Sequence, residues 1–414
     1  MINGLLLSQI KKGKITLTSN QNMPRRKGAL AFLALISAFP PLSTVLYIPA
    51  LPQMVEALDT TQTSINMTLS MFFLFYSVGL LFWGPLSEKF GRKPILLSGL
   101  TIYVFASVFC AFSQNVEQLI AGRIIQALGG SAGTVVATAI VKDLYSGRER
   151  EKIMATIMSM VIIAPMVAPV LGALLLKYTS WRTIFLVLAA IGTTALLRGM
   201  LFRETLSGKF TGSVIGSWCR LLVVLKNLGF SSLLLIFSLA PIALMAFLAS
   251  ASYIYIDGFG LTEGQFSLFF AFNATCAMVG PTIYMRMRKH IEPKLIITGC
   301  FILIAVCGVV VSVFGHMSPW LLALSVGPVT MAVITVRVPG THLMLEQQEE
   351  DSGSASALIN FFAMFMGSMG MQLVTLWPGP LVTNLGHIQI GVGVVCCILW
   401  LLCRNRPFII QPPS

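Results

Sequence analysis

The stretch Gly84–Pro94 reads GPLSEKFGRKP and is flanked by two long apolar runs, at about 65–86 and 95–113. It carries one acidic and three basic side chains, whereas its flanks are nearly free of charge. A run of roughly 20 apolar residues is long enough to cross a membrane as a helix. The stretch therefore predicts a tight charged loop that joins two transmembrane helices at a membrane face.

The rest of the chain has the same apolar character. Of its 414 residues 56% are hydrophobic and 10% are charged, with a mean hydropathy of +0.84, whereas a soluble domain carries about 25% charged residues. We expect twelve membrane-spanning helices, at about 28–50, 65–86, 95–113, 118–140, 153–176, 183–201, 230–252, 265–285, 295–315, 320–342, 353–376 and 386–403. The predicted fold class is an all-α membrane protein with twelve transmembrane helices in two six-helix bundles.

The domain organisation follows from the lengths of the connections, which are short except at about 202–229. This segment divides the predicted spans into six plus six. The expected parts are an N-terminal extension (1–27), a first bundle (28–201), a linker (202–229), a second bundle (230–403) and a tail (404–414).

The formal net charge of +13 is explained by where the cations lie. Lys and Arg fall at 11–27, 89–93, 142–152, 198–226, 286–294 and 404–406, which places 24 of the 28 in every second segment between spans. By the positive-inside rule both termini are cytoplasmic. Membrane lipids are therefore expected partners and nucleic acid is not.

Cysteine and histidine give no sign of a metal site. The eight cysteines and four histidines are dispersed without metal-ligand spacing, and most of the cysteines lie within apolar runs, where they act as small hydrophobic residues. We expect no metal, no cofactor and no enzymatic activity, because no catalytic constellation or soluble domain is present.

The two halves of the chain echo each other. Gly84-Pro85 precedes a basic stretch that is followed by ILLSG at 95–99, and Gly280-Pro281 precedes a basic stretch that is followed by LIITG at 295–299. Each site ends the second predicted span of its half. A six-helix repeat of this kind points to a transporter that rocks two bundles about a binding site near the middle of the membrane.

Five further motifs carry a family resemblance. They are LYIPALPQM (46–54), AGRIIQALGG (121–130), APMVAPVLGALLL (164–176), SWRTIF (180–185) and DSGSASALINF (351–361). Together with the charged loop they resemble the major facilitator superfamily, its drug/proton antiporter branch, and within it the bicyclomycin and chloramphenicol resistance (Bcr/CflA-like) exporters. The resemblance implies the major facilitator fold, alternating access, a small-molecule substrate, protons as coupling partner and the inner membrane of a bacterial cell. The expected oligomeric state is a monomer.

The charged loop is predicted to act as a cytoplasmic latch between the bundles. Gly84 and Gly91 permit tight turning and close approach, while Glu88 can pair with Arg92 or cap a neighbouring helix. Lys93 completes the basic side of the latch. The alternative is a solvated loop whose charges only set the topology.

Arg123 is the sharpest candidate within a predicted span. Gln126 lies one turn further on, so the two side chains can share a face, and a cation inside the membrane usually marks an aqueous path or a buried partner. The alternative is a side chain that extends to the membrane surface. The resemblance implies that Arg123 faces the central cavity, and Tyr47 and Asn360 are further candidates to line it.

The fifth predicted span carries Pro165, Pro169 and Gly172. Prolines kink a helix, and small residues let a neighbouring helix pack closely. This pattern resembles the antiporter motif of the family, which is associated with exchange rather than leak. The alternative is a kinked packing helix without directional meaning.

One position departs from the subgroup and affects the mechanism. The resemblance places an aspartate two residues before Tyr47, where a buried carboxyl could carry the coupling proton, but the residue here is Val45. All 15 acidic residues lie in loops or at span ends. Glu56 and Glu117 are the substitutes we consider.

The predicted function is an inner-membrane exporter of drugs or other small molecules. Without an acid in the core, Arg123 and Arg337 would be the charges of the cavity, which favours neutral or anionic cargo such as a phenicol-like antibiotic or a carboxylate siderophore. The first alternative is an uncoupled facilitator or importer of a metabolite, because of Val45. The second is a sensor or scaffold that no longer transports.

Overall fold

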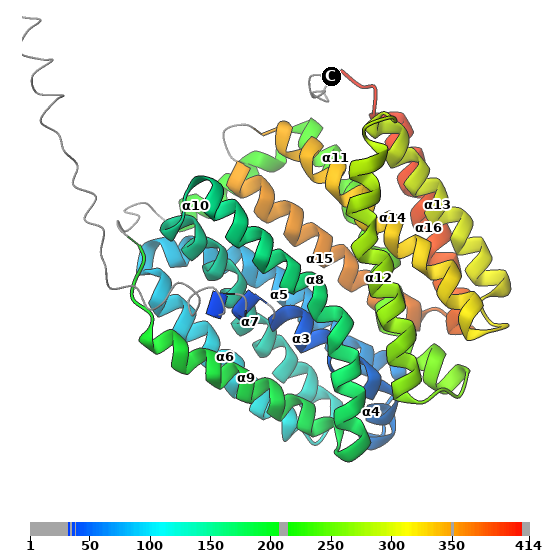
Figure 1. The fold of residues 1–414 in the computed structure, drawn as a ribbon, viewed down its shortest axis with the longest axis horizontal. Helices are drawn as coiled ribbons and strands as arrows, with labels where there is room; N and C mark the ends of the chain where they lie inside the picture. Colours follow the sequence, from blue (N-terminus) through cyan, green and yellow to red (C-terminus); the bar gives the residue numbers. More distant parts are fainter. Residues whose placement is uncertain (1–31, 34, 38, 207–213, 349–351, 408–414) are drawn as a thin grey trace, which may run out of the picture.

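The computed structural model describes residues 32–33, 35–37, 39–206, 214–348 and 352–407. These residues form helices joined by short turns, with no strand among them (Figure 1). The predicted extension at 1–27 lies outside the described residues, as does most of the predicted tail. The helices form two groups that correspond to the two halves of the chain.

The first half begins with a broken helical segment and continues with five long helices. The segment consists of α3 (Phe39–Val45), the short 3₁₀ helix η1 (Ile48–Ala50) and α4 (Leu51–Ala57). The long helices are α5 (Gln62–Phe90), α6 (Arg92–Ala111), α7 (Val116–Leu144), α8 (Gly147–Tyr178) and α9 (Trp181–Leu201). Thr61 and Asn115 cap α5 and α7, since each side chain accepts a hydrogen bond from a backbone amide of the first turn.

The second half contains six long helices. They are α11 (Leu228–Ser252), α12 (Glu263–Met287), α13 (Pro293–Phe314), α14 (Pro319–Glu346), α15 (Ser352–Leu376) and α16 (Leu381–Cys403), and a π-helical turn, η2 (Tyr253–Gly258), extends α11. Of the helices in the described residues, ten are long and apolar enough to cross a membrane. The broken first segment and α8, which has an apolar part at Ile163–Tyr178, supply the other two spans. The prediction of a twelve-helix fold is confirmed.

The linker contains a helix that hydropathy did not predict. α10 (Val214–Leu225) contacts α5 of the first half and both α11 and α15 of the second. The Trp218 ring stacks on Phe82 at 5.6 Å between centroids, and Trp218 Nε1 donates to the Leu81 carbonyl at 3.3 Å. The linker is therefore attached to both halves.

The charged stretch of the second span is mostly helical, which corrects the predicted loop. α5 continues through Gly84 and Pro85 to Phe90, and α6 begins at Arg92. Gly91 alone makes the turn, with φ of 110°, a conformation that favours glycine. Hydropathy marks where the apolar layer ends, but a helix can continue past that point with polar residues.

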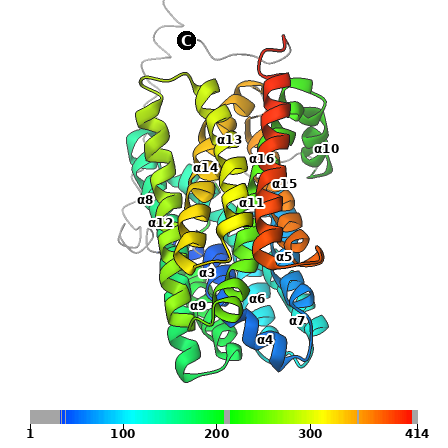
Figure 2. The same ribbon diagram turned by 90° about the vertical axis from the view of Figure 1, so that its right-hand side faces the viewer.

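The two halves contact each other through pairs of equivalent helices. The second helix of each half packs against the fifth helix of the other, which gives the pairs α5 with α15 and α12 with α8 (Figures 1 and 2). This reciprocal arrangement agrees with the six-helix repeat predicted from the two Gly-Pro sites. Pro85 and Pro281 lie within α5 and α12, the second membrane-spanning segment of each half.

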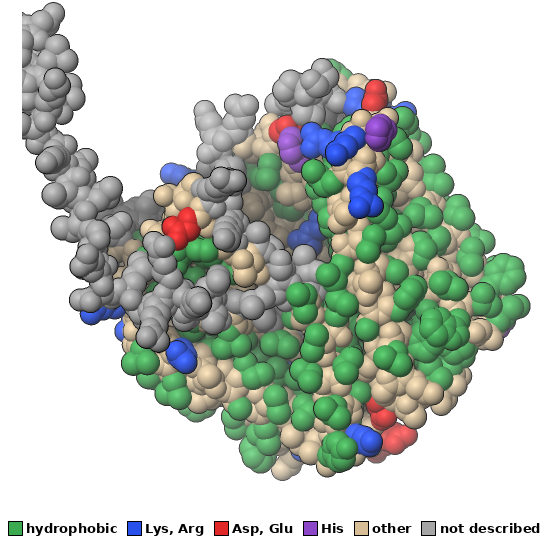
Figure 3. Space-filling model, viewed as in Figure 1, with side chains coloured by type: hydrophobic (Ala, Val, Ile, Leu, Met, Phe, Trp, Pro, Cys, Tyr) green, Lys and Arg blue, Asp and Glu red, His purple; other side chains and the backbone are tan. Residues whose placement is uncertain are grey.

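The side-chain hydrogen bonds that described residues form between the two halves lie at one end of the molecule. They are Gln53 to Glu263 (2.9 Å), Thr63 to the Thr375 carbonyl (3.1 Å), Asn66 to the Ala249 carbonyl (3.2 Å), Ser70 to Gln372 (3.2 Å) and Ser267 to the Pro169 carbonyl (3.0 Å). We call this the sealed end. The opposite end, where α5, α7, α9, α12 and α14 terminate, is called the basic end. Lys and Arg side chains gather there on the face in Figure 3, and the molecule is hollowed between its halves.

Candidate functional site

Arg92 holds the turn after α5 in place. Its Nε donates to Asp143 Oδ2 near the end of α7 at 3.0 Å, and its Nη1 donates to Ser87 Oγ at 2.6 Å. The Arg92 and Asp143 side chains are 8% and 18% exposed. The ion pair therefore ties the α5–α6 turn to α7 in a largely buried setting, where loss of either partner would leave an uncompensated charge.

Glu204, directly after α9, caps the start of α6. Its carboxylate accepts hydrogen bonds from the backbone amides of Arg92 (3.0 Å) and Lys93 (3.1 Å) and from those of Thr205 and Leu206. Burial alone would raise the pKa of Glu204, but these backbone hydrogen bonds together lower it below its ordinary value. A carboxylate at a helix N-terminus also interacts favourably with the helix dipole.

The other predicted latch residues lie in more open surroundings. Glu88 is exposed and, among the contacts of the described residues, does not form the expected pair with Arg92. A Cβ added at Gly84 would have no neighbour within 4 Å. Lys93 Nζ donates to the Met200 carbonyl at 2.8 Å. The described contacts of Arg92 and Lys93 stay within the first half, so in this conformation the predicted latch stabilises one bundle and does not join the two.

Arg123 lies in an aromatic cage inside the first half. Its side chain is fully buried, and its guanidinium carbon lies 4.1, 4.6 and 5.8 Å from the ring centroids of Phe72, Tyr47 and Phe185. Aromatic faces attract cations, most strongly where water is excluded. The rings come from α5, from the break in the first segment and from α9, so three elements hold this one cation.

The hydrogen bonds of Arg123 go to neutral groups. Its Nη1 donates to the Ser43 carbonyl at 2.9 Å and also to Gln126 Oε1, so Arg123 and Gln126 share a face as predicted. Gln126 in turn donates to Ser107 Oγ at 2.7 Å. Arg123 Nε and Nη2 have no hydrogen-bond partner in the described part of the chain. The cation is thus stabilised by rings and dipoles rather than by a carboxylate.

Tyr47 and Val45 lie at the break in the first segment. The Tyr47 hydroxyl is hydrogen-bonded to Thr68 at 3.1 Å, and both Tyr47 and Val45 are buried. Val45 belongs to the same apolar cluster as Tyr47 and Phe185. The position where the resemblance expects a proton-carrying aspartate is therefore packed as core.

The proline-containing part of α8 contacts both the first segment and the second half. A Cβ on Gly172 would lie 2.0 Å from the Leu46 carbonyl oxygen, so only glycine allows α8 to approach the break this closely. The Pro169 carbonyl accepts the hydrogen bond from Ser267 of α12. Pro165 lies one turn earlier, half-buried. These residues therefore position the broken helix next to the Arg123 cage.

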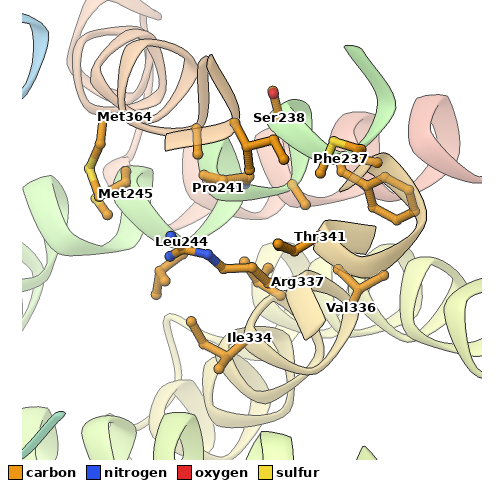
Figure 4. Close-up of a pocket in the computed structure, with 15 residues that line it drawn as sticks. Phe237, Ser238, Pro241, Leu244, Met245, Ile334, Val336, Arg337, Thr341 and Met364 are labelled. Carbon is orange, nitrogen blue, oxygen red and sulfur yellow. The ribbon is translucent and has the colours of Figure 1, made fainter. Parts of the chain in front are cut away.

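A second cation lines a pocket between α11, α14 and α15. Arg337 reaches from α14 across this pocket toward Leu244 of α11, and the wall includes Pro241, Met245 and Met364 (Figure 4). Arg337 Nη2 donates to Asn360 Oδ1 of α15 at 3.2 Å. Arg337 is exposed, in contrast to Arg123. Asn360 is thus in a different half from the other predicted cavity residues.

The comparisons with known proteins agree with this architecture. A family model described as Major Facilitator Superfamily matches residues 32–371, which is most of the chain. This chain belongs to the major facilitator superfamily. The superfamily consists of transporters of small molecules rather than enzymes, and the protein is accordingly a multi-pass membrane protein.

Among its superfamily relatives are proteins named for drug resistance. The chain is 31% identical to the chloramphenicol resistance protein of Pseudomonas aeruginosa, over 87% of each chain. It is 25% identical to the bicyclomycin resistance protein homolog of Haemophilus influenzae, covering 85% of this chain and 90% of the relative. These relatives confirm the resemblance to the drug-resistance exporters.

A solved structure shares the fold at low identity. The crystal structure of the nucleoside transporter NupG matches with a TM-score of 0.74 and 12% identity, covering 91% of this chain and 98% of NupG. At this identity the likeness shows the fold alone.

Sequence reasoning missed two acids of the site, Asp143 and Glu204. Both follow predicted span ends in the segments that carry most of the Lys and Arg residues. An acid among these cations could have been recognised as a candidate partner for one of them. Their pairing with Arg92 could not be predicted, because it depends on how α7 and α9 pack against α6.

Proposed function

We propose that this protein is an inner-membrane exporter of small amphipathic molecules that are neutral or anionic, and that it works by alternating access. The observation that carries the proposal is the contact between two pseudo-equivalent halves at the sealed end, with a hollow between them at the other end (Figure 3). Arg337 lines a separate pocket in the second half. The names of the drug-resistance relatives support export as the direction.

The described conformation corresponds to one of the two states of an alternating-access cycle. We take the basic end as cytoplasmic, from the positive-inside rule, so the hollow is open to the cytoplasm and closed at the periplasmic side. Cargo would enter from the cytoplasm or the inner leaflet. The cycle would then break the hydrogen bonds of the sealed end and bring the basic ends of the two halves together.

The charges of the spans set the cargo preference. Arg123 and Arg337 are cations within the membrane-spanning helices, and the described acidic residues lie at helix ends or in turns. Arg337 makes its pocket positive, and Arg123, although enclosed in its cage, adds to the positive potential within the spans. A site of this sign repels cationic drugs and accepts neutral or anionic molecules. The methionines and apolar side chains of the α11–α14–α15 pocket are suited to varied apolar groups.

Proton coupling is the second part of the proposal. The resemblance to proton antiporters supports it, but Val45 is packed where a proton-carrying carboxyl would stand. Exchange would therefore need a substitute such as Glu56 or Glu117, both outside the apolar interior. An uncoupled facilitator is the second candidate function, and the burial of Val45 is the observation that favours it.

Accumulation of cargo in energised cells tests both candidates. Cells that express the protein would be loaded with chloramphenicol, with a cationic dye or with an anionic siderophore, each with and without a protonophore. Cells that carry the empty vector serve as the control without transport.

An exporter lowers the accumulation of chloramphenicol or the siderophore but not of the dye, and the protonophore abolishes this effect if protons drive it. Flux that only runs down the concentration gradient of the compound, and that the protonophore does not change, favours the uncoupled facilitator. Accumulation equal to that of cells with the empty vector for every neutral and anionic compound would contradict the proposal.

A further inference from the structure

The pocket lined by Arg337 combines one cation with mainly apolar walls inside the membrane-spanning helices. Arg337 lies nine residues before the end of α14, which is about 14 Å along the helix from the basic end. Its neighbours in the pocket are mainly apolar residues of three helices. A cation this far inside a span usually faces an aqueous path, and Arg337 is exposed there.

The described residues leave most of the guanidinium unpaired. The hydrogen bond from Nη2 to Asn360 Oδ1 uses one N–H group, and a guanidinium has five donors in a planar fork. The ion pairs among the described residues are Arg92 with Asp143 and His342 with Glu346. Arg337 therefore has donors available toward the pocket and no carboxylate to neutralise it.

Asn360 fixes the direction of the fork. Its Nδ2 donates to the Ser356 carbonyl one turn earlier in α15 at 2.9 Å, which leaves Oδ1 directed at Arg337. α14 and α15 have few contacts with each other, whereas α11 packs against both. The Arg337–Asn360 hydrogen bond thus spans the gap between α14 and α15 and holds the guanidinium over the pocket.

The size of the pocket limits what it can hold. About 50 Å³ is free for water-sized groups, compared with about 10–15 Å³ for one water. This space suits a single small polar group rather than an entire drug-sized molecule. The apolar wall then contacts the part of the ligand next to that group.

We propose that Arg337 binds an anionic group of the cargo, most simply a carboxylate, and that Asn360 is the positioning residue for its guanidinium. The pairing is bidentate, as the planar fork favours. This inference rests on the proposed function, because it names the substrate class of that same cavity: amphipathic monoanions with the charge at one end. Arg123 does not serve this role in the described conformation, because it is fully enclosed by its cage.

Two probes of equal size separate charge from shape. 1-Naphthylacetate carries a carboxylate, and 1-naphthylacetamide replaces it with a neutral amide. Equilibrium binding of each to the purified full-length protein would be followed by naphthyl fluorescence, for wild type, Arg337→Gln, Arg337→Lys and Asn360→Ala. Lys289→Gln, which removes an exposed cation at the basic end, is the matched control for net charge.

We expect Arg337→Gln to weaken binding of the acid by about 10- to 100-fold, the usual worth of a hydrogen bond to a charged group, and to leave binding of the amide unchanged. Arg337→Lys should bind the acid more tightly than Arg337→Gln does but less tightly than wild type, because lysine keeps the positive charge and lacks the planar set of donors. Asn360→Ala should weaken acid binding less than Arg337→Gln does. Lys289→Gln should match wild type.

Retained amide binding shows that each variant is folded. The inference is overturned if wild type does not bind the acid, if Arg337→Gln binds the acid as tightly as wild type, or if it loses both probes equally. Extrusion of the acid from cells is the separate readout for export. Acid binding that depends on Arg337 without any extrusion supports the subsite and contradicts the exporter.

Discussion

Replacing Gly172 by alanine tests how α8 supports the Arg123 cage. The added Cβ would lie 2.0 Å from the Leu46 carbonyl oxygen and 3.1 Å from its carbonyl carbon, and real Cβ atoms essentially never come closer than 3.0 Å to such atoms. The distance between α8 and the broken helix must therefore widen by about 1 Å. Both partners are backbone, so no side-chain rotation relieves the contact. Overpacking of this kind costs about 1–3 kcal/mol.

The displaced segment carries Tyr47, whose ring contacts the Arg123 guanidinium. We therefore expect Gly172→Ala to lower the midpoint of thermal unfolding by a few degrees and to reduce extrusion beyond what the loss of folded protein explains. Gly391→Ala in α16 is the matched control, because its Cβ would have no neighbour within 4 Å. Unfolding would be followed by size-exclusion chromatography after heating at one fixed rate. If Gly172→Ala is as stable and as active as Gly391→Ala, the reasoning about this contact is wrong.

Three further predictions concern the charged groups. Arg123→Ala should abolish extrusion while the protein still inserts in the membrane and purifies as one species; wild-type flux would remove Arg123 from the mechanism. Arg92→Ala leaves a largely buried Asp143 without its cation and should cost about 1–3 kcal/mol, between the values for surface and buried pairs. Adding Asp143→Asn should restore part of this stability, and a double-mutant cycle that shows no coupling would count against the pair. Glu204 has a lowered pKa when folded, so its contribution should be complete above the unfolded value of about 4.3 and be lost as the pH falls through the lower folded value. The stabilities of wild type and Glu204→Gln should converge in acid, and a constant difference down to that range would refute the assignment.

The number and order of the spans could be predicted from the sequence because hydropathy reports directly on the apolar layer of the membrane. The ends of the helices could not. Gly84–Phe90 extends α5 beyond its apolar part, and Gly147–Ile162 precedes the apolar part of α8. α10 was missed because a short amphipathic helix has no long apolar run.

The site was only partly predictable for a related reason. An arginine in an apolar span is conspicuous in sequence, so Arg123 and its neighbour Gln126 could be identified from helical spacing. The rings of the cage come from elements far apart in the chain, and which rings meet depends on helix packing. The same holds for Arg337 and Asn360, which lie on different helices with little direct contact. Spacing along one helix is readable from sequence, whereas register between helices is not.

The kind of hydrogen bonds at the sealed end determines how the contact between the halves responds to salt. Among the described residues its side-chain hydrogen bonds involve hydroxyl, amide and carbonyl groups and one carboxylate, and none has a cationic donor. Each such bond contributes about 0.5–1.5 kcal/mol to the stability of the contact. Salt screens interactions between charges and barely weakens hydrogen bonds between neutral dipoles. With the sealed end on the periplasmic side, as proposed, changes in the salinity outside the cell would barely change how readily the sealed end opens.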